Sequence, residues 1–275
     1  MSYWWILQHL NQRTLGEHLS YLLPPALFIL DDWQQKNKIL GIRCLFYILK
    51  TMPGAELRWY GRAAVIYDAL KPLLFLREAE VLSILYPAII EVADVLESDP
   101  SNTGKLKSES AHDVILHHLL REMRHEQKLT LRSVYAATLP RILSTMGIFV
   151  IRWSQDLMDV CSEYLATFEA PTAADRINIL RALQVYVREC WPQVHIDASS
   201  MVQMVVRFLY DVTADCATYN NQIIRDITEE AELLINLLNS AAPKTMQELL
   251  QGLEDVTVDI HCHQILKRTF NISAF

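Results

Sequence analysis

Two adjacent aspartates, Asp31 and Asp32, interrupt a hydrophobic stretch that runs from Leu22 to Leu49. Paired carboxylates hold magnesium in all-helical prenyl-chain synthases, where a further carboxylate follows at position i+4. In this chain that position is Gln35, and no second acidic cluster of that type follows. Magnesium needs hard oxygen ligands and substrate phosphates. We therefore expect Asp31 or Asp32 to cap the next helix instead, by accepting the free amide hydrogens of its first turn.

A second set of candidate ligands lies in the segment HHLLREMRHE, where His118, Glu122 and His125 are spaced i, i+4 and i+7. This spacing places three potential metal ligands on one helix face. The segment is otherwise charged, which is typical of a solvated face, and it contains no HExxH pattern. His112 and Asp113 resemble the His-Asp pair of helical phosphohydrolases, but the upstream partner histidine is missing at any suitable distance. We predict no metal site here.

Other catalytic patterns are incomplete. His261, Cys262 and His263 are consecutive, so on a helix their side chains point about 100° apart and diverge. The chain contains no GxGxxG, GxxxxGK[ST] or GxSxG motif. We predict a protein that is not an enzyme and has no cofactor. An all-helical metal-dependent enzyme is the alternative, and metal analysis of the purified chain would distinguish it.

Composition indicates an all-α protein. Only seven of 275 residues are glycine, whereas sandwiches, barrels and nucleotide-binding folds use glycine in their tight turns and phosphate loops. The net charge of −7 argues against a nucleic-acid partner, which requires a basic surface. The five cysteines form no CxxC pair, so we expect reduced thiols in the cytoplasm or the nucleus. We expect no membrane span and no secretory signal.

Apolar residues recur at three- and four-residue steps, as in Ile39, Ile42, Phe46 and Leu49. Helices that are apolar around most of their circumference must be covered on several sides. The pattern predicts six helix pairs, at 17–30 with 35–51, 57–75 with 78–97, 109–126 with 129–146, 149–168 with 172–189, 197–212 with 219–239, and 244–252 with 256–268. The pairs begin about 40–52 residues apart, close to the period of HEAT and armadillo repeats.

We therefore predict one HEAT/armadillo-like α-solenoid of about six helical hairpins over residues 1–275, with a mobile polar loop at about 97–110. Acidic and basic residues six apart, Asp32 with Lys38 and Glu126 with Arg132, fit the HEAT pattern in which charged hydrogen bonds link adjacent repeats. The aromatic pairs Trp59–Tyr60 and Trp4–Trp5 are the best candidates for exposed side chains. Exposed aromatics on such a surface often mark a protein partner.

The segment LGEHLSYLLPPALFILDDWQQKNKILGIRCLFYIL (15–49) closely resembles the Tel-two-interacting protein two (Tti-two) family. The matching positions are Leu23, Pro24, Pro25, Asp31, Asp32, Asn37, Lys38, Leu40, Gly41, Cys44 and Leu45. The segments AELRWYGRAAVIYDAL (55–70), LRSVYAATLPRILSTMGIFVIR (131–152) and CWPQV (190–194) are similar as well. The resemblance covers nearly the whole chain and weakens over the last 25 or so residues.

The resemblance implies a non-catalytic subunit of the TTT complex, with Tti-one and Tel-two as partners. That complex serves as an adaptor by which Hsp90 and R2TP mature the PI3-kinase-like kinases mTOR, ATM, ATR and DNA-PKcs. Family members carry a substantial N-terminal half that has no counterpart here, so we expect this chain to correspond to the C-terminal half or a short form. Another HEAT-type scaffold, of the phosphatase or transport type, is the alternative, because composition and period alone do not separate these classes.

Overall fold

Helices are the only regular secondary structure among the described residues. The computed structural model describes residues 2–98, 110–167, 172–214 and 219–254, and none of these residues lies in a β-strand. The chain divides into two compact units, unit 1 from Met1 to His118 and unit 2 from Leu119 to Phe275. The all-α prediction is confirmed, and the prediction of one continuous solenoid through both units stays a prediction.

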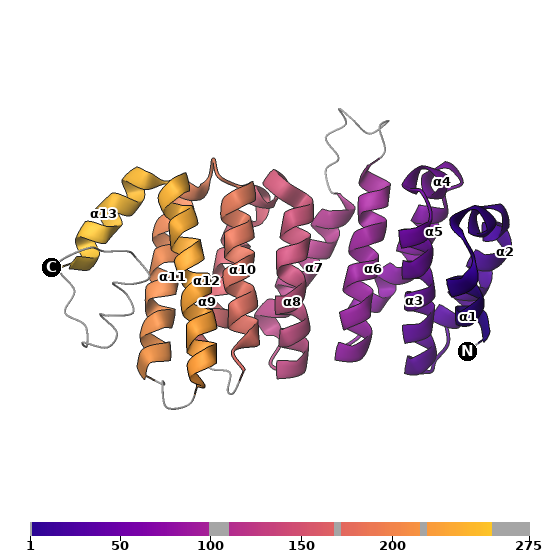
Figure 1. Cartoon of the computed structure of the whole chain (residues 1–275), viewed down its shortest axis with the longest axis horizontal. Coiled ribbons are helices and arrows are strands. Elements are labelled where there is room, and N and C mark those ends of the chain that lie inside the picture. The colour runs from indigo at the N-terminus through magenta and orange to yellow at the C-terminus, as the bar shows by residue number, and fades with distance from the viewer. Residues whose placement is uncertain (1, 99–109, 168–171, 215–218, 255–275) are drawn as a thin grey trace. The chain divides into compact units, whose positions relative to one another are not determined.

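Unit 1 is a stack of helices in which α3 packs against both α2 and α6, and α5 packs against α6 (Figure 1). Its elements are α1 (Ser2–His9), α2 (Gln12–Leu30), α3 (Gln35–Thr51), α4 (Gly54–Trp59), α5 (Arg62–Leu70), the 3₁₀ helix η1 (Lys71–Phe75), α6 (Ala79–Glu97) and the first half of α7 (Ala111–His125). Helix α6 carries more buried apolar side chains than any other helix described in unit 1, from Val81 near its start to Ala93 in its last third. It therefore forms the core to which the other helices attach.

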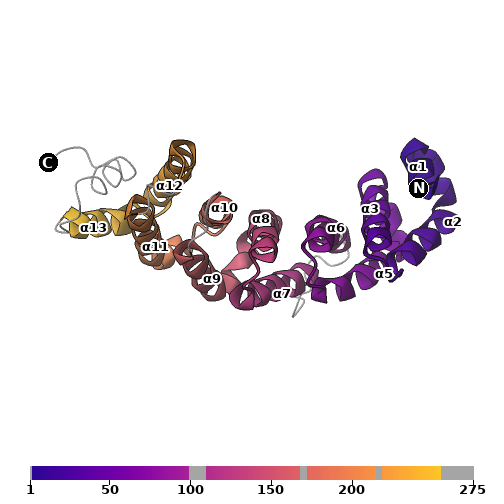
Figure 2. The ribbon, with the colours of Figure 1, turned by 90° about the horizontal axis from the view of Figure 1, so that it is seen from below.

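Unit 2 consists of two layers of helices. In Figure 2, α8, α10 and α12 form one layer, and α9 and α11 form the other. The elements after α7 are α8 (Leu129–Met146), the 3₁₀ helix η3 (Gly147–Trp153), α9 (Ser154–Ala166), α10 (Ala174–Glu189), α11 (Val194–Ala214), α12 (Asn221–Ala241) and α13 (Pro243–Glu254). This stacking of helical pairs is the arrangement of HEAT and armadillo repeats, as the sequence predicts.

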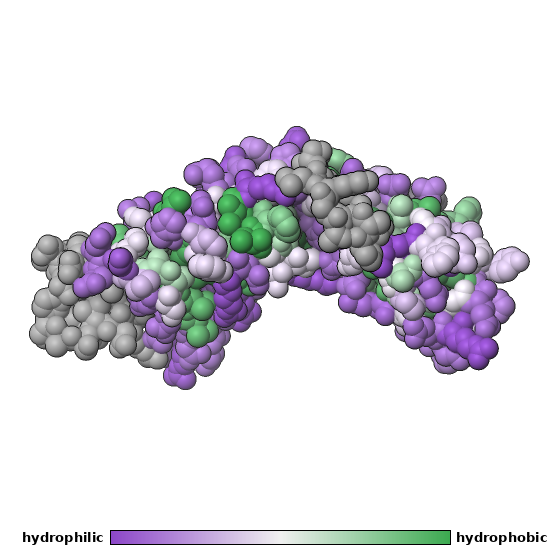
Figure 3. Space-filling view, turned by 90° about the horizontal axis from the view of Figure 1, so that it is seen from above, coloured by the Kyte–Doolittle hydropathy of each residue, from purple (hydrophilic) through white to green (hydrophobic). Residues whose placement is uncertain are grey.

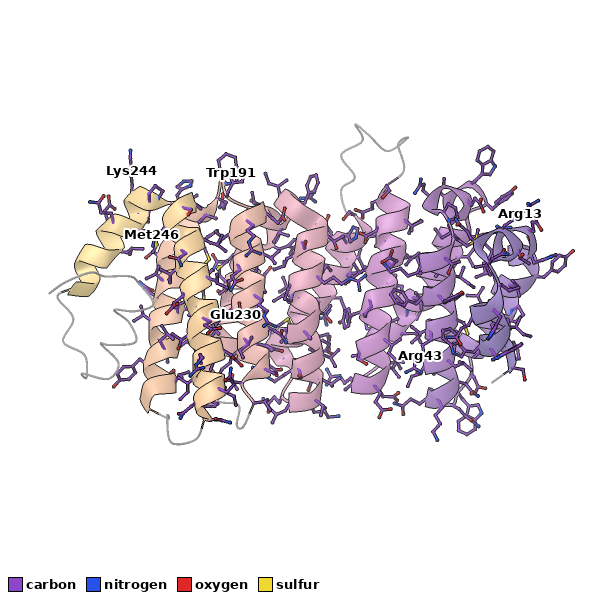
Figure 4. The ribbon with its side chains drawn as sticks, viewed as in Figure 1. Arg13, Arg43, Trp191, Glu230, Lys244 and Met246 are labelled. Atoms are coloured by element: carbon purple, nitrogen blue, oxygen red, sulfur yellow. The ribbon has the colours of Figure 1, made fainter. Side chains whose placement is uncertain are left out.

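Polar contacts join α10 and α12 within this layer. Glu230 of α12 accepts hydrogen bonds from Arg181 Nε at 2.8 Å and from Gln184 Nε2 at 2.7 Å, both on α10 (Figure 4). Gln184 is buried, so its amide needs partners inside the protein. These hydrogen bonds help to fix how α10 packs against α12.

The first five predicted helix pairs are present with small differences at their ends. The largest difference lies in the predicted helix 57–75, which is interrupted at Gly61, where the backbone takes a positive φ of 65°. A further helix, α1, precedes the first predicted pair. The second helix of the sixth pair, 256–268, lies outside the described residues, as do residues 99–109 of the predicted loop.

Among the described residues, one hydrophobic run, Leu129–Ala166, has the length and composition of a membrane span. In the structure this run contains three elements, because α8 ends at Met146 and η3 precedes α9. Apolar side chains of α8, among them Leu139 and Leu143, are buried, and α8 packs along α10. Packing inside unit 2 accounts for the hydropathy of this segment.

Candidate protein-interaction site

The turn between α2 and α3 is built around the carboxylate of Asp32. Its Oδ1 accepts a hydrogen bond from the backbone amide of Gln34 at 2.8 Å, and its Oδ2 accepts one from Asn37 Nδ2 at 2.8 Å. These hydrogen bonds, with a smaller contribution from the charge of Lys38, lower the pKa of Asp32. Both oxygens are thus engaged within the turn, which is a structural role rather than that of a magnesium ligand.

The predicted helix cap is placed differently from our expectation. The N-cap residue of α3 is Gln34, and it makes no side-chain capping hydrogen bond. Asp32 lies two residues earlier and bonds to the amide of the cap residue itself, as aspartates do in turns. Asp31 is the C-cap residue of α2. The expectation that either aspartate caps the first turn of α3 is therefore wrong, because Gln34 occupies the N-cap position and the carboxylate of Asp32 is bonded to the Gln34 amide and to Asn37.

Gly41 allows α2 and α3 to approach one another closely. A Cβ atom placed on Gly41 would lie only 2.5 Å from Cα and 2.6 Å from the backbone nitrogen of Leu30. Real Cβ atoms do not come so close to a neighbouring backbone, so no other residue fits without moving a helix. This residue of the signature therefore sets the spacing of the first hairpin.

The two prolines of the signature lie inside α2, which continues past both of them to Leu30. Since proline has no amide hydrogen, Pro24 and Pro25 remove two hydrogen-bond donors from the helix. In the same region, the hydroxyl group of Tyr3 in α1 donates to the backbone carbonyl of Leu22. Together with Gly41 and Asp32, the prolines shape a hairpin; they do not form a reactive centre.

The predicted partner surface at Trp59 and Tyr60 is exposed. Trp59 has 85% and Tyr60 has 68% of its surface accessible, at the corner where α4 meets α5. The guanidinium of Arg62 stacks over the Tyr60 ring at 4.5 Å and donates from Nη2 to Ser20 Oγ of α2 at 2.9 Å. Gly61 makes this corner possible through its positive φ. Arg62 thus restrains the Tyr60 ring, and both aromatic rings lie on the surface instead of filling the core.

His118, the first of the three candidate metal ligands, has other contacts. His118 donates from Nε2 to the carbonyl of Leu74 at 2.9 Å, and its ring packs edge-on against Phe75. Among the described residues, no group of three or more histidine, cysteine or acidic side chains is arranged to hold a metal ion. Cys262 and the two histidines beside it lie outside the described residues.

His112 is the centre of a buried ion cluster in unit 1. Its Nδ1 lies 2.7 Å from Glu97 Oε2 and its Nε2 lies 2.8 Å from Asp94 Oδ1. Carboxylates only accept hydrogen bonds, so the ring donates from both nitrogens and is cationic. Burial alone would lower the pKa of His112, but the two carboxylates outweigh it and raise this pKa to about 9. The cluster fastens the start of α7 to the end of α6.

Sequence reasoning missed several exposed aromatic residues. Trp33, in the α2–α3 turn, is 85% exposed, and Trp191, in the α10–α11 turn, is 66% exposed. A tryptophan inside the polar turn DDWQQ, or next to a proline at a helix end, is a signal that could have indicated both. Of the predicted N-terminal pair, Trp5 is exposed, whereas Trp4 packs edge-on against Tyr47.

The sequence profile of the Tti2 family matches residues 2–172, which is more than half of the chain. The chain belongs to the Tti2 family. This confirms the resemblance to the family, whose matched residues include the whole α2–α3 hairpin. The family match ends at residue 172, within unit 2, whereas the matches to individual relatives extend over most of the chain.

Curated relatives match almost the whole chain. TELO2-interacting protein 2 of Mus musculus is 30% identical over 259 residues, which cover 92% of this chain and 51% of the relative. The Homo sapiens protein of the same name is 29% identical over 247 residues, which cover 90% of this chain and 49% of the relative. The chain thus spans about half the length of the curated relatives it matches.

Solved structures of repeat proteins align with the chain at low sequence identity. An engineered protein covers 90% of this chain and 97% of its own, with a TM-score of 0.49 and 17% identity. A designed armadillo repeat protein covers 90% of this chain and 98% of its own, with a TM-score of 0.48 and 14% identity. The fold assignment rests on the helices of this chain and not on these two alignments.

Proposed function

We propose that this chain is a subunit of the TTT co-chaperone adaptor, in which it binds the Tti-one and Tel-two subunits. Through them it supports the maturation of PI3-kinase-like kinases, among them mTOR, ATM, ATR and DNA-PKcs, by Hsp90 and R2TP. The observation that carries the proposal is the match of the Tti2 family profile to residues 2–172. The name of the curated relatives, TELO2-interacting protein 2, supports Tel-two as a partner.

The role we propose is non-catalytic. Asp32 is the most conspicuous candidate for chemistry, but both of its carboxylate oxygens accept hydrogen bonds within the α2–α3 turn. Gly41, another signature residue, allows the two helices to pack closely. A stack of helical pairs offers long surfaces on which a partner can dock. We propose that the chain works by presenting such surfaces. We propose that the chain binds neither nucleic acid nor a membrane.

Within unit 1, we propose the corner of Trp59 and Tyr60 as a contact surface for a TTT partner. Exposed aromatic side chains bury a large apolar area when a partner covers them, and a ring that is already restrained loses less entropy on binding. Arg62 restricts the Tyr60 ring and ties the corner to α2. A partner helix that covers both rings would gain hydrophobic contact without reshaping the surface.

We also propose that the chain acts in the cytoplasm or the nucleus. Cys44, Cys161 and Cys190 are all buried and free of disulfide bonds, which suits a reducing compartment. Burial raises the pKa of the Cys161 thiol to about 12, so this side chain behaves as a packed apolar group.

The test is a tagged pull-down from cells at physiological salt, followed by mass spectrometry. Recovery of Tti-one, Tel-two and PI3-kinase-like kinases is the expected result. Trp59→Ala should lower the recovery of at least one TTT subunit, whereas Trp33→Ala, at an equally exposed tryptophan of the same unit, should leave it unchanged. Recovery of another class of scaffold partner, such as phosphatase or transport subunits, in place of TTT would overturn the proposal.

A further inference from the structure

Contacts from two other helices converge on the last turn of α6. The backbone carbonyl of Val95 accepts a hydrogen bond from Nη1 of Arg58 in α4 at 2.9 Å. In the same turn, Asp94 and Glu97 both pair with the ring of His112 in α7. Figure 1 shows α4 and the end of α6 at the same end of unit 1, and Figure 3 looks onto that end, whose visible surface is mostly hydrophilic. One helical turn thus connects α4 with α7.

This last turn of α6 has little packing of its own. The buried side chains of α6 end at Ala93, and all residues from Asp94 to Glu97 are partly exposed. The last carbonyl groups of a helix also lack partners within the helix, and here Ser98 bonds to the carbonyl of Asp94. Helix ends of this kind fray unless contacts from outside hold them. The order of the turn therefore depends on its contacts with α4 and α7.

The carboxylates of this turn are unfavourably placed in the helix. Asp94 and Glu97 are three residues apart, so they lie on the same face and repel one another. They also lie at the end of the helix where its dipole is negative, which disfavours carboxylates. The cationic ring of His112 bonds to both and offsets both effects. Without this ring, the repulsion would act on a helix end that has no buried side chain.

Arg58 links this turn to the two exposed rings of Trp59 and Tyr60, which we name the aromatic corner. Helix α4 has only six residues, which is too short for a helix that is stable on its own. The buried side chain of Leu57 packs α4 against the core, and the hydrogen bond from Arg58 to Val95 fixes how α4 is turned on it. The aromatic corner follows Arg58 directly in the chain, so its position depends on where the last turn of α6 lies.

We propose that His112 is a positioning residue for the aromatic corner. Its ring holds the last turn of α6 in place, this turn presents the Val95 carbonyl to Arg58, and Arg58 anchors α4. The order of the aromatic corner therefore depends on a residue of a different helix. The consequence for partner binding rests on the proposed function, whereas the order of α4 is a property of the chain alone.

Hydrogen exchange of the folded full chain tests the inference without any partner. Mass spectrometry of peptides that cover residues 54–61 reports the exchange of the α4 amides. In His112→Gln these amides should exchange about tenfold faster than in wild type, because α4 opens locally more often once its anchor is loose. Arg58→Met should have a similar effect, whereas Arg58→Lys, which keeps a donor, should retain most of the protection. Exchange of α4 in His112→Gln that equals wild type would overturn the inference.

A double variant shows whether His112 acts through Arg58. The chain that carries both His112→Gln and Arg58→Met should exchange no faster at α4 than Arg58→Met alone, since the hydrogen bond to Val95 is already lost. Two effects that multiply would mean independent roles and would contradict the inference.

The coupling should also act in the reverse direction. Arg58→Met should speed exchange severalfold at the start of α7, where the amide of His112 donates to Glu97 Oε1 at 3.2 Å. Arg58 is only half-buried, so this variant serves even if His112→Gln does not fold. Unchanged exchange at the start of α7 would refute the shared role of the α6 turn.

The matched control is Arg176→Met in unit 2, which removes two hydrogen bonds of another buried cation. It lowers stability far from α4 in the sequence and in the other unit, so the exchange of residues 54–61 should equal that of wild type. If Arg176→Met speeds the exchange of α4 as much as His112→Gln does, the effect is a general loss of stability and the inference fails.

The pull-down separates this inference from the proposed function. If wild type recovers TTT subunits but His112→Gln leaves the exchange of α4 unchanged, the proposed function stands and the inference fails. If His112→Gln speeds the exchange of α4 as expected while wild type recovers no TTT subunit, the inference stands and the TTT assignment fails. Faster exchange of α4 in His112→Gln, together with the loss of a TTT subunit that Trp59→Ala also loses, supports both.

Discussion

The guanidinium carbon of Arg132 lies 3.8 Å from the centre of the Tyr164 ring, and that of Arg176 lies 5.3 Å from the centre of the Phe208 ring. The two pairs have the same sequence separation, and the contact is closer in the first pair than in the second. In each, an arginine in the first turns of one helix, α8 or α10, reaches an aromatic ring on the following helix, α9 or α11. A cation–aromatic contact thus repeats in successive helical pairs of unit 2.

The two arginines differ in how well their donors are satisfied. Arg176 donates to the Thr167 carbonyl at 2.8 Å and to the Tyr219 hydroxyl at 3.0 Å. Arg132 is equally buried, but it makes one long hydrogen bond of 3.3 Å to the Glu126 carbonyl, and its Nε and Nη2 have no partner among the described residues. A buried charge with unpaired donors lowers stability.

We therefore predict that Arg132→Met changes the free energy of unfolding by less than about 1 kcal/mol, because methionine fills the space and removes an incompletely paired charge. Arg176→Met should cost about 2–3 kcal/mol, because two good hydrogen bonds of a buried charge are lost. Urea denaturation of the purified variants measures both. If Arg132→Met were as unstable as Arg176→Met, the contact between Arg132 and Tyr164 would stabilise the fold by more than the unpaired donors of Arg132 destabilise it.

Gly41→Ala should lower the free energy of unfolding by about 2–3 kcal/mol or more, because the new methyl group collides with the backbone of Leu30. The matched control is Gly16→Ala in α2, where the nearest atoms are ends of flexible side chains at 3.3 Å. There, the better helix propensity of alanine should leave stability unchanged or raise it by up to about 1 kcal/mol. Thermal unfolding followed by circular dichroism distinguishes the two, and equal melting temperatures would contradict the close approach of α2 and α3.

His112 should make stability depend on pH in the alkaline range. Its pKa is raised in the folded state from 6.5 to about 9. A raised pKa stabilises the fold fully below the unfolded value, and this stabilisation is lost as the pH rises through the folded value. Because Asp94 and Glu97 are partly exposed, solvent screens their attraction to His112. We therefore expect the charged His112 to stabilise the fold by about 2 kcal/mol, less than the whole pKa shift would give.

The measurement compares wild type and His112→Gln by urea denaturation at about pH 6 and about pH 10. The difference in unfolding free energy should be large at the lower pH and nearly absent at the higher one. His125→Gln, at an exposed position of the same helix, is the control. Below the ordinary pKa of Glu97, the advantage should shrink again, because the carboxylate that pairs with His112 becomes protonated. A difference that is the same at every pH would mean that His112 is not charged in the fold.

Asp32→Ala should lower the melting temperature, whereas Asp31→Ala should leave it nearly unchanged. Asp32 is bonded to the Gln34 amide and to Asn37, while Asp31 is exposed at the end of α2. Hydrogen bonds to the Asp32 carboxylate lower its pKa, so its contribution is present above the ordinary value and is lost as the pH falls. The gap between the two variants should therefore close in acid. Equal melting temperatures of the two variants at neutral pH would show that the hydrogen bonds of Asp32 do not stabilise the turn.

The helices themselves could be predicted from the sequence because their hydrophobic period is strong. Residues 35–51 and 129–146 have the same bounds in the prediction and in the structure, since turn residues or a glycine delimit helices that are apolar on most sides. The interruption of 57–75 could not be predicted, because one glycine within a helical pattern does not reveal whether it takes a positive φ. Here Gly61 does, and this brings Trp59 and Tyr60 to the surface.

The exposed aromatic side chains and the polar contacts were harder to predict than the fold. Phe149 and Trp191 belong to residue types that are usually buried, and their exposure depends on how η3 and the α10–α11 turn pack together. The charge spacing of Glu126 and Arg132 predicted an ionic link between repeats. In the structure, the Glu126 carboxylate instead accepts from the amides of Gln127 and Lys128, and Arg132 reaches the next repeat through an aromatic ring. Only tertiary contacts decide between these partners.

Co-expression of the chain with Tti-one and Tel-two from the same organism, followed by size-exclusion chromatography, tests directly whether the chain assembles with these two proteins. If the chain is a TTT subunit, as proposed, the three proteins elute together and the chain alone gives a mostly helical circular dichroism spectrum. A chain that is folded and helical, yet elutes separately from both partners at low and at physiological salt, would contradict its role as a TTT subunit.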